Sequence, residues 1–160
     1  MPKVLFVCTA NVCRSPMAEA LFKNLVAREI DSQVWKVESA GTWAVAGVPA
    51  AINSRLAMYN RELDIEDHRS QPVNGKMLNT FDLILTMERR HKETLSIEFP
   101  EISDRVYVIT EMVGSFFDIW DPVGASLVEF ESTANELEDI LTQGYGYIKR
   151  LVVEGSGNKV

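Results

Sequence analysis

The sequence has few cysteines, few histidines and no long apolar run. Only two of its 160 residues are cysteine and two are histidine. Secreted disulfide scaffolds need more cysteines, spaced further apart than Cys8 and Cys13, so this class is excluded. The first apolar run, residues 4–7, is one strand long and meets Asn11 and Arg14 too soon for a signal peptide or a membrane span. We therefore expect a cytoplasmic protein that contacts no membrane.

Positive charge is also scarce. Sixteen lysines and arginines face 23 acidic residues, which gives a net charge of -7. Proteins that bind nucleic acid present a basic face, so we expect no nucleic-acid partner. A phosphorylated substrate would need local positive charge to offset this overall field. Two cysteines cannot form a structural zinc site, and His68 and His91 lack ligand spacing with them, so we predict no metal and no cofactor.

What the sequence does contain is enough apolar material for one core. Hydrophobic residues make up 46% and charged residues 24% of the chain, as in ordinary globular proteins. A chain of this length fits one domain. We predict a single domain over residues 1–155, a disordered tail over residues 156–160, and a monomer.

Strand patterns alternate with helix patterns along the chain. Residues 3–7 form an unbroken apolar run, typical of a central parallel strand covered on both faces. The helix that follows is expected to have Ser15 as N-cap and Pro16 at its first position. Further strands are predicted over residues 34–39, 81–86 and 105–110, and helices over 49–59, 88–99 and from 134 to 152 through two glycines. Residues 68–75 are expected to be irregular and residues 113–126 to form an ordered functional loop. This order predicts a doubly wound α/β sheet, whose ligands bind beyond the carboxyl ends of the strands.

The segment from Cys8 to Ser15 joins the first strand to the first helix. Its backbone N–H groups can converge at the positive end of that helix, which makes an anion cradle. The same groups and Arg14 favour the thiolate form of Cys8, which is the nucleophilic form. The planar guanidinium of Arg14 can bind two phosphate oxygens at once. Ser15 can donate a hydrogen bond to the sulfur, and Asn11 can brace the loop.

Cys13 has two interpretations. It is either a small packing residue at the start of a helix or a reversible disulfide partner that shields Cys8 from overoxidation. The sequence leaves both open.

Residues 8–16, a cysteine followed by five residues and Arg-Ser-Pro, resemble the phosphate-binding loop of low-molecular-weight protein tyrosine phosphatases. Four further segments occur in the order and spacing of that family: residues 39–42, 67–70, 81–87 and 121–122. The resemblance implies a flavodoxin-like three-layer α/β sandwich with a central four-stranded parallel sheet. It also implies that the substrate is a phosphorylated protein or peptide and that inorganic phosphate is a product.

The resemblance assigns a role to each residue of the site. Cys8 would attack phosphorus, Arg14 would clamp the phosphate, and Asp121 would act as general acid and then general base. Asp118 is the rival acid. The other members of the predicted site are the phosphate-binding loop residues Thr9, Ala10, Asn11, Val12, Cys13 and Ser15, the loop-supporting residues Asn11, Ser15, Ser39 and His68, and a substrate wall of Trp43 and Trp120.

The sequence departs from the pattern of the family at two places. Ala10 stands where the family usually has glycine, so the loop is strained if this residue needs a positive φ. Val123 and Gly124 follow Asp121-Pro122, where an aromatic residue is common.

Three alternative functions compare with tyrosine phosphatase activity. Arginine phosphatases of the same type carry threonine at the position of Val12, which disfavours that activity. Arsenate reductases need further cysteines, and none follows Cys13. A phosphopeptide-binding module would need neither nucleophile nor acid.

Overall fold

The computed structural model describes residues 1–30 and 33–157. Its centre is a four-stranded, all-parallel sheet with the strand order β2-β1-β3-β4. The strands are β1 (Lys3–Cys8), β2 (Lys36–Gly41), β3 (Leu83–Thr86) and β4 (Val106–Val108). This confirms the predicted four-stranded parallel sheet. The fourth strand is shorter than expected, because the chain turns at Ile109 into the short 3-10 helix η2 (Ile109–Val113).

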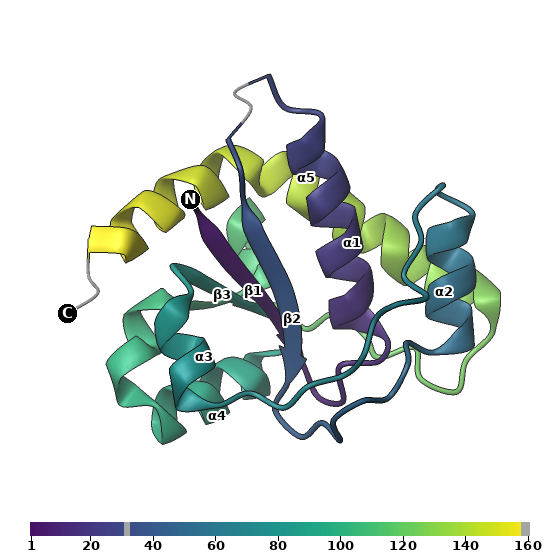
Figure 1. The fold of residues 1–160 in the computed structure, drawn as a ribbon, viewed down its shortest axis with the longest axis horizontal. Coiled ribbons are helices and arrows are strands. Elements are labelled where there is room, and N and C mark those ends of the chain that lie inside the picture. Colours follow the sequence, from purple (N-terminus) through teal and green to yellow (C-terminus); the bar gives the residue numbers. More distant parts are fainter. Residues whose placement is uncertain (31–32, 158–160) are drawn as a thin grey trace.

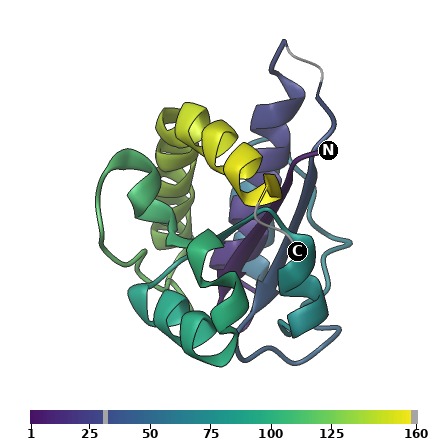
Figure 2. The ribbon, with the colours of Figure 1, turned by 90° about the vertical axis from the view of Figure 1, so that its left-hand side faces the viewer.

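Helices cover both faces of the sheet and complete the predicted three-layer sandwich (Figures 1 and 2). One layer holds α1 (Arg14–Ala27), α2 (Ile52–Tyr59) and α5 (Leu127–Gly157), and the other holds α3 (Gly75–Thr80), α4 (Arg89–Glu98) and the 3-10 helix η1 (Pro100–Arg105). Side chains of β1 alternate between the layers: Phe6 points into the first core and Leu5 into the second. Both are fully buried, which explains the unbroken apolar run in the sequence.

The carboxyl end of β1 lies at the switch between the layers. The chain leaves β1 toward α1 in one layer, whereas it leaves the neighbouring β3 toward α4 in the other. Met87 donates its N–H to Val7 O at 3.0 Å, so the two departing loops run side by side. A crevice at such a point is where α/β sheets bind ligands.

The predicted start of the first helix was wrong, and one short helix was not predicted. Helix α1 begins at Arg14 with Cys13 as N-cap, so Ser15 and Pro16 lie inside the first turn and the Ser15 hydroxyl is used elsewhere. Residues 68–74 are irregular, as predicted, but Gly75 begins the unpredicted helix α3. The Asn74 side chain accepts a hydrogen bond from Met77 N at 2.9 Å and so caps that helix.

The final helix is continuous and longer than predicted. It passes through Gly144, where an added Cβ would lie 2.7 Å from Met112 Cβ, so this glycine permits close packing. Helix α5 extends to Gly157 and therefore includes the first two residues of the segment that was predicted to be a tail. Residues 158–160 lie outside the described residues. Within the described part of the chain, no helix combines the length and apolar character needed to cross a membrane.

Candidate active site

Residues 8–15, which we call the Cys8 loop, wrap around the sulfur of Cys8. Asn11 N donates to Cys8 Sγ at 3.3 Å, and Ser15 Oγ lies 2.9 Å from the same sulfur. Cys8 is 3% exposed and forms no disulfide. The N-terminus of α1 starts directly behind it. The amide of Asn11 and the hydroxyl of Ser15 thus lie within hydrogen-bond distance of this sulfur at the N-terminus of a helix.

A buried, neutral network fixes one side of the loop. Asn11 has a left-handed backbone (φ 59), and its Nδ2 donates to Ser15 Oγ at 2.8 Å and to Ser39 Oγ at 2.9 Å. Its carbonyl accepts from His68 Nε2 at 2.8 Å. The structure thus brings together all four residues predicted to support the loop. Ala10 does not have a positive φ, so the strain considered for it falls instead on Asn11, a residue type that tolerates this conformation.

The donors and acceptors of this hydrogen-bond network can be assigned. Ser39 Oγ donates to the Glu19 carboxylate at 2.6 Å, and an ionised carboxylate can only accept. Asn11 donates one amide hydrogen to each of the two serines. The oxygen of Ser15 is therefore an acceptor, and the hydroxyl hydrogen of Ser15 is free to be donated to Cys8 Sγ. When the sulfur is ionised, Ser15 is therefore a donor to it.

Gly41 lets the end of β2 touch the Cys8 loop. A Cβ at this position would lie 2.3 Å from Thr9 O and 3.1 Å from Ala10 C. The amides of Thr42 and Trp43 donate to Cys8 O and Thr9 O, both at 2.9 Å. The absence of a side chain at Gly41 therefore allows a backbone contact that holds the start of the loop.

Charged groups hold the opposite side of the loop. Arg14 is 1% exposed, its Nη1 donates to Ile119 O at 2.6 Å, and its Nη2 donates to Glu88 Oε2 at 2.8 Å. Glu88 Oε1 also accepts a hydrogen bond from Arg90 Nε at 3.1 Å. Burial alone would raise the pKa of Glu88, but hydrogen bonds from Arg90 and Arg14 outweigh burial and hold this pKa below its ordinary value. An ionised Glu88 orients Arg14, whose guanidinium has five N–H donors.

Of the two candidate acids, Asp121 is the one near the guanidinium. Asp121 Oδ2 lies 3.4 Å from Arg14 Nη2, and its Oδ1 accepts from Val123 N at 3.1 Å. Asp118 Oδ1 instead accepts from the backbone N–H of Arg89 at 2.8 Å and from its Nε at 3.2 Å. The backbone hydrogen bond from Arg89 is the main reason why the pKa of Asp118 lies below its ordinary value.

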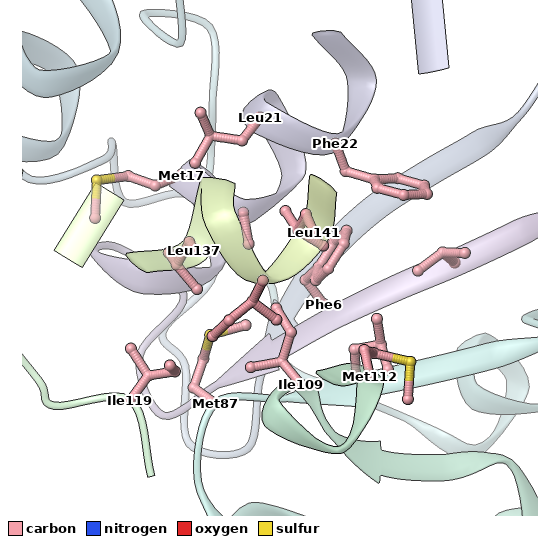
Figure 3. Close-up of a cluster of buried hydrophobic side chains, with 14 of the residues drawn as sticks. Phe6, Met17, Leu21, Phe22, Met87, Ile109, Met112, Ile119, Leu137 and Leu141 are labelled. Atoms are coloured by element: carbon pink, nitrogen blue, oxygen red, sulfur yellow. The ribbon is translucent and has the colours of Figure 1, made fainter. Parts of the chain in front are cut away.

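Ile119 anchors the segment that carries Asp121. Its side chain is 1% exposed and lies beside Met87 in the first core (Figure 3). Its N–H donates to Met87 O at 2.8 Å, while its carbonyl accepts from Arg14. Upstream, Phe117 N donates to Thr110 Oγ1 at 3.1 Å. The region predicted to be an ordered functional loop is thus pinned to β3 and to Arg14.

The two tryptophans of the predicted wall lie in different surroundings. Trp43 is 85% exposed, and its backbone N–H is bound to Thr9 O, so this residue lies beside the Cys8 loop. Trp120 is 60% exposed and lines a hollow of about 330 Å³ whose other residues, Glu129 to Glu136, belong to α5. Val12 is half-buried and packs against the first core.

Cys13 is buried behind the loop and stays a thiol at neutral pH. Burial, helped by the charges of Asp121 and Cys8 and opposed by Arg14, raises the pKa of Cys13 to about 12. Its carbonyl accepts from Ser54 Oγ at 3.1 Å. Both cysteines are free in the structure.

Sequence reasoning missed several residues that touch the site. Among them, Glu88 and Ile119 hold Arg14, and Glu19 ends the network around Asn11. Glu88 lies two residues after the end of β3, so its place beyond the carboxyl end of a strand beside β1 was a usable signal. Ile119 had no such signal, because it acts through its backbone carbonyl.

Comparisons with known proteins identify the family. The family model for low molecular weight phosphotyrosine protein phosphatase matches residues 3–153. A protein-arginine-phosphatase of Bacillus subtilis (strain 168) is 37% identical over 141 residues, which are 88% of this chain and 92% of that protein.

Two solved structures have the same fold. The low molecular weight protein tyrosine phosphatase from T. tengcongensis has a TM-score of 0.84 and 36% identity, and the match covers 89% of this chain and 97% of that chain. A cysteine-to-serine mutant of the YwlE arginine phosphatase with a phosphorylated active site serine has a TM-score of 0.87 and 34% identity, covering 93% and 99% of the two chains. With a family match over almost the whole length and relatives that share both sequence and fold with it, this chain belongs to the low molecular weight protein tyrosine phosphatase family of hydrolases.

Proposed function

We propose that the protein hydrolyses phosphotyrosine in proteins and small aryl phosphates through a cysteinyl-phosphate intermediate. One observation carries the proposal: donors converge on Cys8 Sγ while Arg14 stands between Glu88 and Asp121, 3.4 Å from the latter. This arrangement supplies a nucleophile, a phosphate clamp and a proton donor within one pocket.

In the first step, the Cys8 thiolate attacks phosphorus in line, and the S–P bond forms as the P–O bond to tyrosine breaks. Arg14 and the amides of the Cys8 loop bind the equatorial phosphoryl oxygens, where negative charge is spread in the transition state. Asp121 gives its proton to the leaving phenolate oxygen. Trp43 offers an apolar wall to the aromatic ring.

In the second step, the ionised Asp121 takes a proton from water, and the resulting hydroxide attacks phosphorus. The S–P bond breaks, the thiolate returns, and inorganic phosphate leaves. Ser15 stabilises the returning thiolate, because its proton is directed at Sγ. The relative with a phosphorylated serine in place of a cysteine supports transfer of phosphate to this position.

Phosphoarginine in proteins is the second candidate substrate. The 37% identical relative named protein-arginine-phosphatase favours it. Val12 favours phosphotyrosine, since it places an apolar side chain where arginine phosphatases of this type carry threonine.

Cys13 lies in the same loop as Cys8, and both are free, which is compatible with a reversible protective disulfide between them. We also propose that the protein is a monomer of the cytoplasm.

The test compares matched peptides that carry phosphotyrosine or phosphoarginine, together with an aryl phosphate, in the presence of a chelator. We expect phosphotyrosine to be turned over faster. Cys8→Ser should reduce turnover to background, and Asp121→Asn should lower it about a hundredfold or more. Asp118→Asn is the matched control acid and should lower it far less. Turnover that persists in Cys8→Ser would refute the mechanism, and binding without turnover in the wild type would make the protein a phosphopeptide-binding module.

A further inference from the structure

The hydroxyl of Thr9 is held between two side chains of the neighbouring layer. Thr9 directly follows Cys8 and is half-buried. Its Oγ1 lies 2.8 Å from His91 Nε2 and 3.1 Å from Arg90 Nη2, both at the start of α4. The mechanism above uses only the backbone of Thr9, so the function of these side-chain contacts is unassigned.

The proton on His91 can be placed from its neighbours. Glu88 N donates to His91 Nδ1 at 3.1 Å, so this nitrogen carries no hydrogen. Burial lowers the pKa of His91 to about 4, with Glu88 opposing the shift and Arg14 and Arg90 adding to it. The ring is therefore neutral at pH 7 with its hydrogen on Nε2, and it donates to Thr9 Oγ1.

Arg90 can also only donate. A guanidinium has no acceptor, so Arg90 Nη2 gives a second hydrogen bond to Thr9 Oγ1. Both lone pairs of the hydroxyl oxygen are then in use, and its own hydrogen is left over. Within residues 1–30 and 33–157 no hydrogen bond takes that hydrogen up. Two accepted bonds, one of them from a cation, polarise the hydroxyl and make it a stronger donor.

A short chain of contacts links this donor to the phosphate clamp. Arg90 Nη2 lies 3.2 Å from Glu88 Oε2, which accepts a hydrogen bond from Arg14 Nη2 at 2.8 Å. Arg14 Nη2 is in turn 3.4 Å from Asp121 Oδ2. Thr9 also belongs to the Cys8 loop and is the residue after the nucleophile of the proposed mechanism. In that mechanism, the acceptor that enters the Cys8 loop is the phosphoryl group.

We infer that the Thr9 hydroxyl donates a hydrogen bond to a phosphoryl oxygen of the substrate, which makes Thr9 a further substrate-binding residue. The inference rests on the proposed function, since it needs phosphate to occupy the Cys8 loop. Arg90 and His91 are then positioning residues, because they act through Thr9 and fix the direction of its proton.

The experiment measures binding of inorganic phosphate by calorimetry, so that it does not depend on turnover. Thr9→Val removes the hydroxyl and keeps the shape, and we expect phosphate to bind about tenfold more weakly, as for a lost hydrogen bond to a charged group. Thr9→Ser keeps the donor and should stay within about twofold of the wild type. Thr142→Val, at an exposed position on α5, is the matched control and should change nothing.

A second pair of variants covers the case in which Thr9→Val does not fold. Arg90→Ala removes one of the two donors to Thr9, whereas Arg89→Ala removes an equally exposed cation that pairs with Asp118 instead. We expect the Arg90 variant to weaken phosphate binding more than the Arg89 variant. Equal phosphate affinities for Thr9→Val and the wild type, or equal losses in the two arginine variants, would overturn the inference. A wild type that binds phosphate but does not hydrolyse phosphotyrosine would refute the proposed function while leaving the role of Thr9 measurable.

Discussion

The two sides of the Cys8 loop are held by different chemistry. On the side of β2 and α1, Asn11, Ser15 and Ser39 form neutral hydrogen bonds that are almost completely buried. On the side of α4, Glu88 and Arg90 form ion pairs that remain partly open to solvent. Buried neutral networks set geometry and respond little to salt or pH, whereas partly exposed ion pairs respond to both.

This difference matches the work that each side has to do. In the proposed mechanism, the neutral side surrounds the sulfur, fixes its position and supplies the Ser15 donor. The charged side surrounds Arg14 and Asp121, where the proposed proton transfers take place. The two sides use different residues, so each can be disturbed without directly changing the other.

The largest effect should come from the neutral side, with Gly41→Ala. The new Cβ would meet Thr9 O at 2.3 Å, so the loop has to shift. We expect a loss of about 3 kcal/mol in the free energy of unfolding, as for overpacking, and a fall in kcat/KM of a hundredfold or more. Gly146→Ala is the control, because nothing lies within 4 Å of its Cβ, and should stabilise α5 slightly. Equal activity of both variants would show that the contact at Gly41 is unimportant.

A smaller effect is expected on the charged side, with Glu88→Gln. This change removes the charge that orients Arg14 and keeps the shape. Breaking a largely buried pair should cost about 2 kcal/mol of stability, and kcat/KM should fall about tenfold because Arg14 is less well placed. Glu93→Gln, exposed on the same helix, is the control. Unchanged kinetics in Glu88→Gln would mean that Ile119 and Asp121 suffice to orient Arg14.

The last effect is the smallest at neutral pH, where it vanishes, and it grows only in acid. Because His91 has a pKa of about 4 when folded and near its ordinary value of 6.5 when unfolded, the unfolded chain binds more protons between these values. The free energy of unfolding should therefore fall as the pH drops from about 6.5 to about 4, by up to about 1 kcal/mol per pH unit. His91→Gln should show a flatter profile in denaturant titrations over this window. An identical slope in the variant would contradict the assigned neutral state.

The sequence was sufficient for the parts of the site that are local in the chain. Cys8, Arg14 and Ser15 lie on one strand-loop-helix unit, so their meeting follows from the pattern of that unit alone. The four-stranded sheet could be anticipated from the family resemblance. The capping role predicted for Ser15 was wrong because α1 already begins at Arg14, and because the Ser15 oxygen, which a cap would use as acceptor, accepts from Asn11 Nδ2 instead.

Contacts between residues that are far apart in the sequence could not be predicted from the pattern of one local unit. The pairing of Arg14 with Glu88 joins residues 74 positions apart, and it depends on β3 lying beside β1. Helix α3 was missed because six residues carry too little periodicity, and Asn74-Gly75 has the composition of a turn. The role of Ile119 depends on a backbone carbonyl, and every residue type has one.

The carbonyl of Ile119 joins the segment that carries Asp121 to Arg14. Ile119 O accepts a hydrogen bond from Arg14 Nη1 at 2.6 Å, two positions before Asp121, while the Ile119 side chain is buried in the first core. A displacement of this segment at Ile119 would therefore also release the guanidinium. If the segment between Gly114 and Gly124 is exchanged to change substrate preference, the new segment should retain a bulky aliphatic residue at position 119. Without it, the exchange would also disturb Arg14, the proposed phosphate clamp.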